Sequence, residues 1–174
     1  MNYLKCSFTQ ILIVVLTLVS IPICSQEREN VSAGENALNY IFEGGQEGYK
    51  CYRIPAVVTT KKGTLLAFAE ARKNGCSDTG HIDLVMKRST DGGKTWGNLE
   101  VIWHDEGNTC GNPSPVVDRT TGSIFLLSTW NLGTDHESDI IAGKSKDTRR
   151  VYVLKSDNDG KSWSRPKEIT SDVK

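Results

Sequence analysis

Two short turns in the sequence are rich in side-chain oxygens, which could bind a cation or stabilise the turn itself. Residues 89–96 read Ser-Thr-Asp-Gly-Gly-Lys-Thr-Trp, and residues 156–163 read Ser-Asp-Asn-Asp-Gly-Lys-Ser-Trp. A calcium loop with Gly160 at its sixth position would place Lys155 first and Pro166 twelfth, where carboxylates are required. We therefore interpret both segments as structural turns, in which Asp or Asn accepts backbone N–H groups, Gly takes a positive φ and Trp packs on the sheet. The repeated positions are Ser89, Asp91, Gly93, Trp96, Ser156, Asn158, Gly160 and Trp163.

Three cysteines beyond the N-terminal segment form a second set of reactive side chains. No two of Cys51, Cys76 and Cys110 have the C-x-x-C spacing of metal or redox sites. Their odd number leaves at least one thiol without a partner among them, so the pairing stays open. We expect them to act mainly as small buried hydrophobic residues.

Short apolar runs separated by Gly, Asp, Asn and Lys indicate the elements that must position these side chains. No long window keeps a helical period, so the sequence predicts an all-β fold. The recurrence of a strand, turn and strand unit is typical of stacked repeats such as solenoids and propellers. The predicted strands cover residues 53–59, 64–71, 81–89, 98–104, 114–118, 123–130, 149–156 and 166–170.

The repeated turn is an Asp box, and together with two upstream motifs it makes the chain resemble the bacterial-type exo-α-sialidases (neuraminidases). Residues 52–55 read Tyr-Arg-Ile-Pro, similar to the family signature, and residues 67–72 read Ala-Phe-Ala-Glu-Ala-Arg. The resemblance implies a six-bladed β-propeller, with about the first two blades in this chain. It also implies a glycoside hydrolase that removes terminal sialic acid from glycoproteins, glycolipids or oligosaccharides. The alternative is a non-catalytic Asp-box propeller that binds glycan or protein.

The resemblance assigns three residues to the chemistry of this reaction. Arg53 matches the arginine that opens a three-arginine clamp on the sialic acid carboxylate, a task that suits a planar, permanently charged guanidinium. Arg72 matches an arginine that lines the substrate pocket. Asp78, six residues later in a polar loop, matches the acid/base aspartate, which protonates the leaving oxygen and then activates water.

Other polar residues near these motifs receive weaker assignments. Glu70 is expected to orient Arg53 or Arg72 through an ion pair, unless it faces outward from its strand. Asn112 resembles a substrate-contacting Asn at the entry to the next blade, or else it belongs to a plain turn. Asp83 is a competing carboxylate, but it lies within a predicted strand. The polar loop 131–148, with Asp135, His136 and Glu137, is expected to contribute to the pocket wall.

The N-terminal segment predicts export. Lys5 precedes an apolar run that ends near Ile23 and is short for a membrane span, so we interpret residues 1–25 as a signal peptide. The mature protein would then be periplasmic or extracellular, with lipid anchoring at Cys24 as the less favoured alternative. We interpret residues 26–48 as a leader with a closing strand around residues 38–42, and residues 49–174 as a partial propeller.

Composition and length set the remaining expectations. The chain has 174 residues, with 21 basic and 21 acidic side chains, so it lacks the positive charge of a nucleic-acid-binding protein. Neither a metal nor an organic cofactor is indicated. The tyrosine nucleophile, its glutamate partner and two further clamp arginines implied by the resemblance should lie beyond Lys174. We therefore expect the 174 residues alone to be an inactive part of a longer enzyme.

Overall fold

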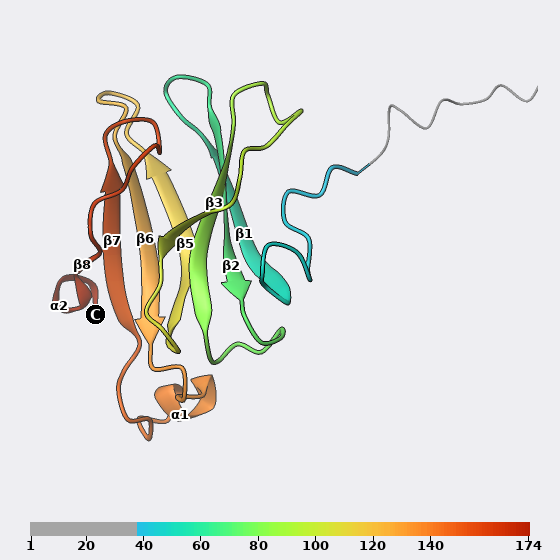
Figure 1. Ribbon diagram of the computed structural model, residues 1–174. Coiled ribbons are helices and arrows are strands. Elements are labelled where there is room, and N and C mark those ends of the chain that lie inside the picture. Colours follow the sequence, from blue (N-terminus) through green and yellow to red (C-terminus); the bar gives the residue numbers. More distant parts are fainter. Residues whose placement is uncertain (1–37) are drawn as a thin grey trace, which may run out of the picture. The chain divides into compact units, whose positions relative to one another are not determined.

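The computed structural model describes residues 38–174, whose eight-stranded sheet consists of two consecutive four-stranded antiparallel units, here called blades (Figure 1). A single parallel pair, Ile82 with Thr109, joins the blades. Within each blade, strands that follow one another in sequence lie side by side. Blade 1 contains β1 (Cys51–Thr59), β2 (Leu65–Arg72), β3 (Ile82–Ser89) and β4 (Glu100–Trp103), and blade 2 contains β5 (Thr109–Val117), β6 (Ile124–Asn131), β7 (Arg150–Ser156) and β8 (Lys167–Glu168).

The observed strands confirm the predicted all-β class and most of the predicted boundaries. The main difference is β5, which begins at Thr109 rather than near residue 114. Pairing of β5 with β6 shifts register between Gly111 and Ser114, and Asn112 has a φ of +54°. The predicted turn at Asn112 is therefore a bulge within a strand, which sequence periodicity cannot distinguish from a turn. Two short helices, α1 (Glu137–Ile141) and α2 (Thr170–Val173), were also not predicted.

Residues 38–50 form turns and irregular chain, so the expectation of a strand around residues 38–42 is not met by this part of the structure. Instead, Phe42, Tyr49 and Tyr52 pack with the small side chains Ala69 and Ala71 on one face of blade 1. The predicted signal peptide and most of the predicted leader lie outside the described residues.

The main hydrophobic core lies between the blades. Because side chains of a strand alternate between its two faces, blade 1 and blade 2 can each direct a set of apolar residues toward the other. The fully buried members are Leu66, Phe68, Leu84 and Met86 from blade 1, and Cys110, Ile124, Leu126 and Leu154 from blade 2. This core holds the blades together and thereby aligns the strand ends that carry the polar site.

The two Asp-box turns, between β3 and β4 and between β7 and β8, share the hydrogen bonds made by their serine hydroxyls. The Ser89 hydroxyl donates to Asp91 (2.8 Å) and accepts the N–H of Gly93 (2.9 Å). In the second turn, Ser156 makes the corresponding bonds to Asn158 and Gly160, both at 3.0 Å. Asn replaces Asp without loss of the motif because the turn uses a side-chain oxygen as the acceptor.

The two Asp-box tryptophans differ in their packing. Trp163 contacts the inter-blade core and meets the Phe68 ring edge-on, with the ring centroids 5.7 Å apart. Trp96 is also only partly buried and does not belong to either core cluster of the described residues. Of the two rings, only Trp163 therefore extends its packing into the inter-blade core of residues 38–174.

Candidate active site

The predicted site residues meet at the end of the blades opposite the Asp boxes, the lower end in Figure 1. There β1, β3 and β5 begin and β2 ends, so residues distant in sequence become neighbours. Together with the loop between β2 and β3, these strand ends line an open pocket of about 260 Å³. Its walls include Arg53, Glu70, Arg72, Asp78, Asn112 and Arg149.

Arg72 is the fixed centre of this site. Its side chain is only 3% exposed, and its guanidinium donates to Glu70 Oε2 from Nη2 (2.5 Å) and Nε (3.2 Å). Its Nη1 donates to the carbonyls of Cys76 (2.7 Å) and Ser77 (2.9 Å), which belong to the loop that carries Asp78. The buried charge is therefore paired and hydrogen-bonded on several sides, as burial of an arginine requires.

Glu70 connects the two blades. Its Oε1 accepts the backbone N–H of Asn112 (2.9 Å), while its other oxygen holds Arg72. A Cβ on Gly111 would collide with the Glu70 carboxylate, so glycine permits the close approach of β5. Of the two orientations considered for Glu70, the structure has the inward one, with Arg72 as the partner.

Arg53 reaches the site from a β-bulge. The pairing of β1 with β2 shifts between Arg53 and Ala56, and Ile54 has a φ of +52°. A bulge redirects a side chain at the end of a strand. The Arg53 guanidinium, on a side chain that is 46% exposed, lies with its Nη1 2.9 Å from Asp78 Oδ1.

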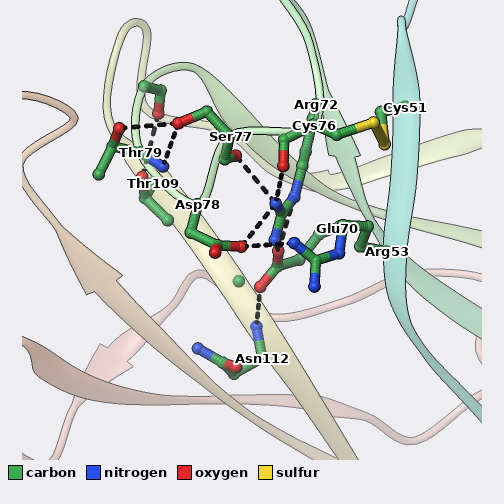
Figure 2. Close-up of polar contacts among 12 residues, drawn as sticks. Cys51, Arg53, Glu70, Arg72, Cys76, Ser77, Asp78, Thr79, Thr109 and Asn112 are labelled. Atoms are coloured by element: carbon green, nitrogen blue, oxygen red, sulfur yellow. Dashed lines mark hydrogen bonds and ion pairs between the residues drawn. A yellow bond between two sulfur atoms is a disulfide. The ribbon is translucent and has the colours of Figure 1, made fainter. Parts of the chain in front are cut away.

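Asp78 is shared between two arginines (Figure 2). The oxygen that accepts Arg53 also lies 2.7 Å from Nη1 of Arg72, and the Asp78 side chain is 63% exposed. The hydrogen bond from Arg72, followed by the charges of Arg72 and Arg53, holds the pKa of Asp78 below its usual range. In the free site Asp78 is thus an ionised carboxylate at the surface of a loop.

The cysteines differ from expectation at this loop. Cys51 and Cys76 form a disulfide, whereas Cys110 is a free, buried thiol whose pKa is raised by burial. The expected role as a small buried hydrophobic residue therefore holds only for Cys110. Cys51 begins β1 and Cys76 lies in the loop before Asp78, and their pairing depends on a loop path that residue spacing does not specify.

The two weaker carboxylate and amide candidates lie in different surroundings. Asn112 lines the pocket and its amide donates to the Thr129 hydroxyl at 2.7 Å. Asp83 is buried, accepts the Tyr49 hydroxyl at 2.6 Å and pairs with His81 at 3.1 Å. Asp83 is therefore used within blade 1 and does not line the pocket.

The loop after β6 contributes part of the pocket wall. Glu137 lies in this wall. The Arg149 guanidinium donates to the Glu137 carboxylate (3.1 Å) and to the side-chain oxygen of Asn131 (3.3 Å). Asp135 instead is buried and accepts the backbone N–H of Asp147. Arg149 was missed by the sequence analysis, although its position just before a strand that begins at this rim was a usable signal.

The two antiparallel blades have the fold of part of a sialidase-type β-propeller. Residues 63–173 match the BNR repeat-like domain, and the chain belongs to this family. It is 36% identical over 147 residues to a sialidase of Bacteroides fragilis, which covers 77% of this chain and 27% of that protein. It is also 36% identical to an exo-alpha-sialidase of Aspergillus fumigatus, over 72% of this chain and 35% of that protein.

A solved structure supports the same assignment. The Hadza microbial sialidase Hz136 superposes with a TM-score of 0.68 and 30% identity, over 76% of this chain and 28% of that protein. The predicted β-propeller fold class is thereby confirmed. The chain spans about a quarter to a third of the length of the two curated relatives described above. Within residues 38–174, no helix is long and apolar enough to cross a membrane.

Proposed function

We propose that the complete protein containing this chain is an exo-α-sialidase that hydrolyses terminal sialic acid from glycans. The observation that carries the proposal is the convergence of Arg53 and Arg72 on the exposed Asp78 in one open pocket. A sialic acid carries a carboxylate next to its anomeric carbon. The site therefore needs a cationic group that binds this carboxylate and, beside it, a proton donor for the leaving oxygen. Similarity to named sialidases supports the same substrate class.

In this proposal Arg53 binds the substrate carboxylate. The Arg53 side chain is half exposed and its partner Asp78 is more exposed still, so water competes with their ion pair and the pair contributes little stability. The incoming carboxylate can therefore replace Asp78 as the partner of Arg53. Arg72 is held by Glu70 and stays in place, which leaves it to line the pocket and orient the loop.

Asp78 is the proposed acid and base. The free site keeps Asp78 ionised, whereas a general acid must carry a proton. When the substrate carboxylate takes over Arg53, one of the cations that stabilise the Asp78 anion is neutralised, and the Asp78 pKa rises. Asp78 can then donate a proton to the leaving oxygen and, once ionised again, accept one from the attacking water.

The remaining groups of the mechanism are proposals that rest on the family resemblance. A tyrosine nucleophile with its glutamate partner and two more clamp arginines would come from residues beyond Lys174. Asn112 lines the pocket beside Glu70 and is proposed to contact the sugar.

We also propose that the protein is exported. Residues 1–25 have the composition of a signal peptide, and the Cys51–Cys76 disulfide fits an oxidising compartment. Mass spectrometry of the mature N-terminus tests this proposal: a chain that begins near residue 26 supports export, whereas a chain that retains Met1 contradicts it.

Release of free sialic acid by the complete protein tests the activity, with sialyl-lactose and an aryl sialoside as substrates. Turnover by the wild type, lost in Asp78→Asn and retained in Asp91→Asn, supports the proposal. Asp91→Asn is a matched control because the second Asp box carries Asn158 at the same position. Binding of sialyl-lactose without any turnover would favour the alternative, a non-catalytic propeller.

A further inference from the structure

The disulfide lies next to both charged groups that meet in the pocket. Cys51 precedes Arg53 by two residues on β1, and Cys76 precedes Asp78 by two residues in the loop between β2 and β3. The Cα atoms of the two cysteines are 5.3 Å apart. A covalent bond thus joins the element that presents Arg53 to the loop that presents Asp78, as Figure 2 shows.

The other contacts of this loop are polar. Its base is closed by the N–H of Lys73 on the carbonyl of His81 (3.1 Å), and its tip is held by Arg72 through the carbonyls of Cys76 and Ser77. Residues 76–78 are exposed to solvent, so the tip has no buried apolar side chain that would anchor it. Segments held by few buried contacts open locally at low free-energy cost.

The ion pairs of Asp78 are poorly suited to hold the loop by themselves. Both side chains of the Arg53–Asp78 pair are substantially exposed, and exposed pairs stabilise weakly. The Arg53–Asp78 pair must also open when a substrate carboxylate binds Arg53. At that moment the disulfide and Arg72 are the remaining links between the loop tip and the strands.

We propose that the Cys51–Cys76 disulfide positions Asp78 for proton donation, so that the bridge serves the acid step more than the stability of the fold. This inference rests on the proposed sialidase function. The substrate carboxylate binds Arg53 on β1, and β1 is also held by its pairing with β2, including Arg53 opposite Glu70. Loss of the bridge therefore weakens proton transfer while substrate binding is largely retained.

The test compares the complete wild-type protein with Cys51→Ser/Cys76→Ser, and with Cys110→Ala as a control that removes the buried thiol. For each protein, kcat and KM are measured with sialyl-lactose, whose leaving group needs a proton, and with a nitrophenyl sialoside, whose leaving group does not. A displacement of about 1 Å can reduce a rate by about 100-fold. We expect kcat for sialyl-lactose to fall by about 10- to 100-fold, with less than about a threefold change for the nitrophenyl sialoside and in KM.

Reduction of the folded wild type provides a second test if the double variant does not fold. Dithiothreitol supplies two electrons and two protons, which yields the Cys51 and Cys76 thiols and cyclic oxidised dithiothreitol. The same selective loss is expected, and it should reverse on reoxidation. Equal losses on both substrates, or no loss on either, would overturn the inference while the wild-type activity still supports the sialidase proposal. Absence of wild-type turnover on both substrates would overturn both.

Discussion

Asp78 and Asp91 lie at opposite ends of blade 1, and their surroundings differ although both are exposed aspartates with a lowered pKa. The pKa of Asp91 is lowered mainly by hydrogen bonds from Thr95 and Ser89 of its own turn. The pKa of Asp78 is lowered by arginines that arrive from β2 and β1. The Asp91 carboxylate is thus fixed by hydrogen bonds within its own turn, whereas the Asp78 carboxylate depends on arginines that can bind a ligand instead.

This difference separates a structural carboxylate from one suited to chemistry. Thr95 contributes both its N–H, at 3.0 Å, and its hydroxyl to Asp91, so release of Asp91 would unmake the turn. Release of Asp78 from Arg53 leaves the strands and the inter-blade core unchanged. A reactive carboxylate is therefore better placed at the rim where long-range contacts meet.

The largest expected effect comes from the same substitution at the two aspartates in the complete protein. Asp78→Asn removes the proposed acid and should lower kcat for sialyl-lactose by about 10²- to 10⁴-fold, the usual contribution of general acid–base catalysis. Asp91→Asn should leave kcat unchanged, because the turn needs only an oxygen acceptor there. Steady-state kinetics check both values, and equal activity of the two variants would remove Asp78 from the mechanism.

The next effect concerns the buried ion pair under the site. Glu70→Gln leaves the buried guanidinium of Arg72 with only the exposed carboxylate of Asp78 as a counter-charge, which should lower the free energy of unfolding by about 3 kcal/mol. Glu137→Gln makes the same chemical change in the more exposed pair with Arg149 and should cost less than about 1 kcal/mol. Denaturant unfolding of the two variants measures the difference, and similar losses would show that burial does not distinguish the pairs.

The same contrast explains how much could be predicted from the sequence. The Asp-box turns were predicted in detail because every donor and acceptor lies within eight residues of sequence. The strands followed from apolar periodicity, and family resemblance brought Arg53, Arg72 and Asp78 together in the prediction. The Cys51–Cys76 bridge could not be predicted, because it depends on how a loop folds back. Arg149 was missed, although it directly precedes a strand that begins at the rim of the pocket.

The bulge at Asn112 shows a further limit of sequence reasoning. Gly-Asn-Pro-Ser-Pro has the composition of a turn, and its residues adopt a bulged strand because Glu70 accepts the N–H of Asn112 from the neighbouring blade. A tertiary hydrogen bond therefore decides the local structure.

The two tryptophans sharpen the comparison between the blades. Trp163→Ala should lower the free energy of unfolding by about 3 kcal/mol, because Trp163 contacts Phe68 across the inter-blade core. Trp96→Ala should lower it by only about 1 kcal/mol, because the partly buried Trp96 ring lies outside both core clusters of residues 38–174. Equal losses in thermal or denaturant unfolding would show that the complete protein covers Trp96 as fully as Trp163.

The smallest expected effect is on the acid titration of the two aspartates. A carboxyl whose pKa is lowered by folding contributes stability above its unfolded pKa, and that contribution is lost as pH falls through the folded pKa. Both Asp78 and Asp91 should therefore stabilise the protein at neutral pH and lose this contribution below about pH 4. Carboxyl chemical shifts of Asp, followed by NMR during an acid titration, measure each folded pKa.

The response to added salt distinguishes the two causes of the lowered pKa at Asp78 and Asp91. Added ions screen interactions between exposed charges, so about 1 M NaCl should raise the pKa of Asp78 toward its usual value as the attraction of Arg53 weakens. The hydrogen bonds from Thr95 and Ser89 to Asp91 are short-range and come from neutral groups, so the pKa of Asp91 should change little. Arg53→Gln at low salt should imitate the effect of NaCl at Asp78 alone. If both carboxyls respond equally to salt, the lowered pKa of Asp78 does not arise from separable arginine charges, and a substrate carboxylate could not raise it by taking over Arg53.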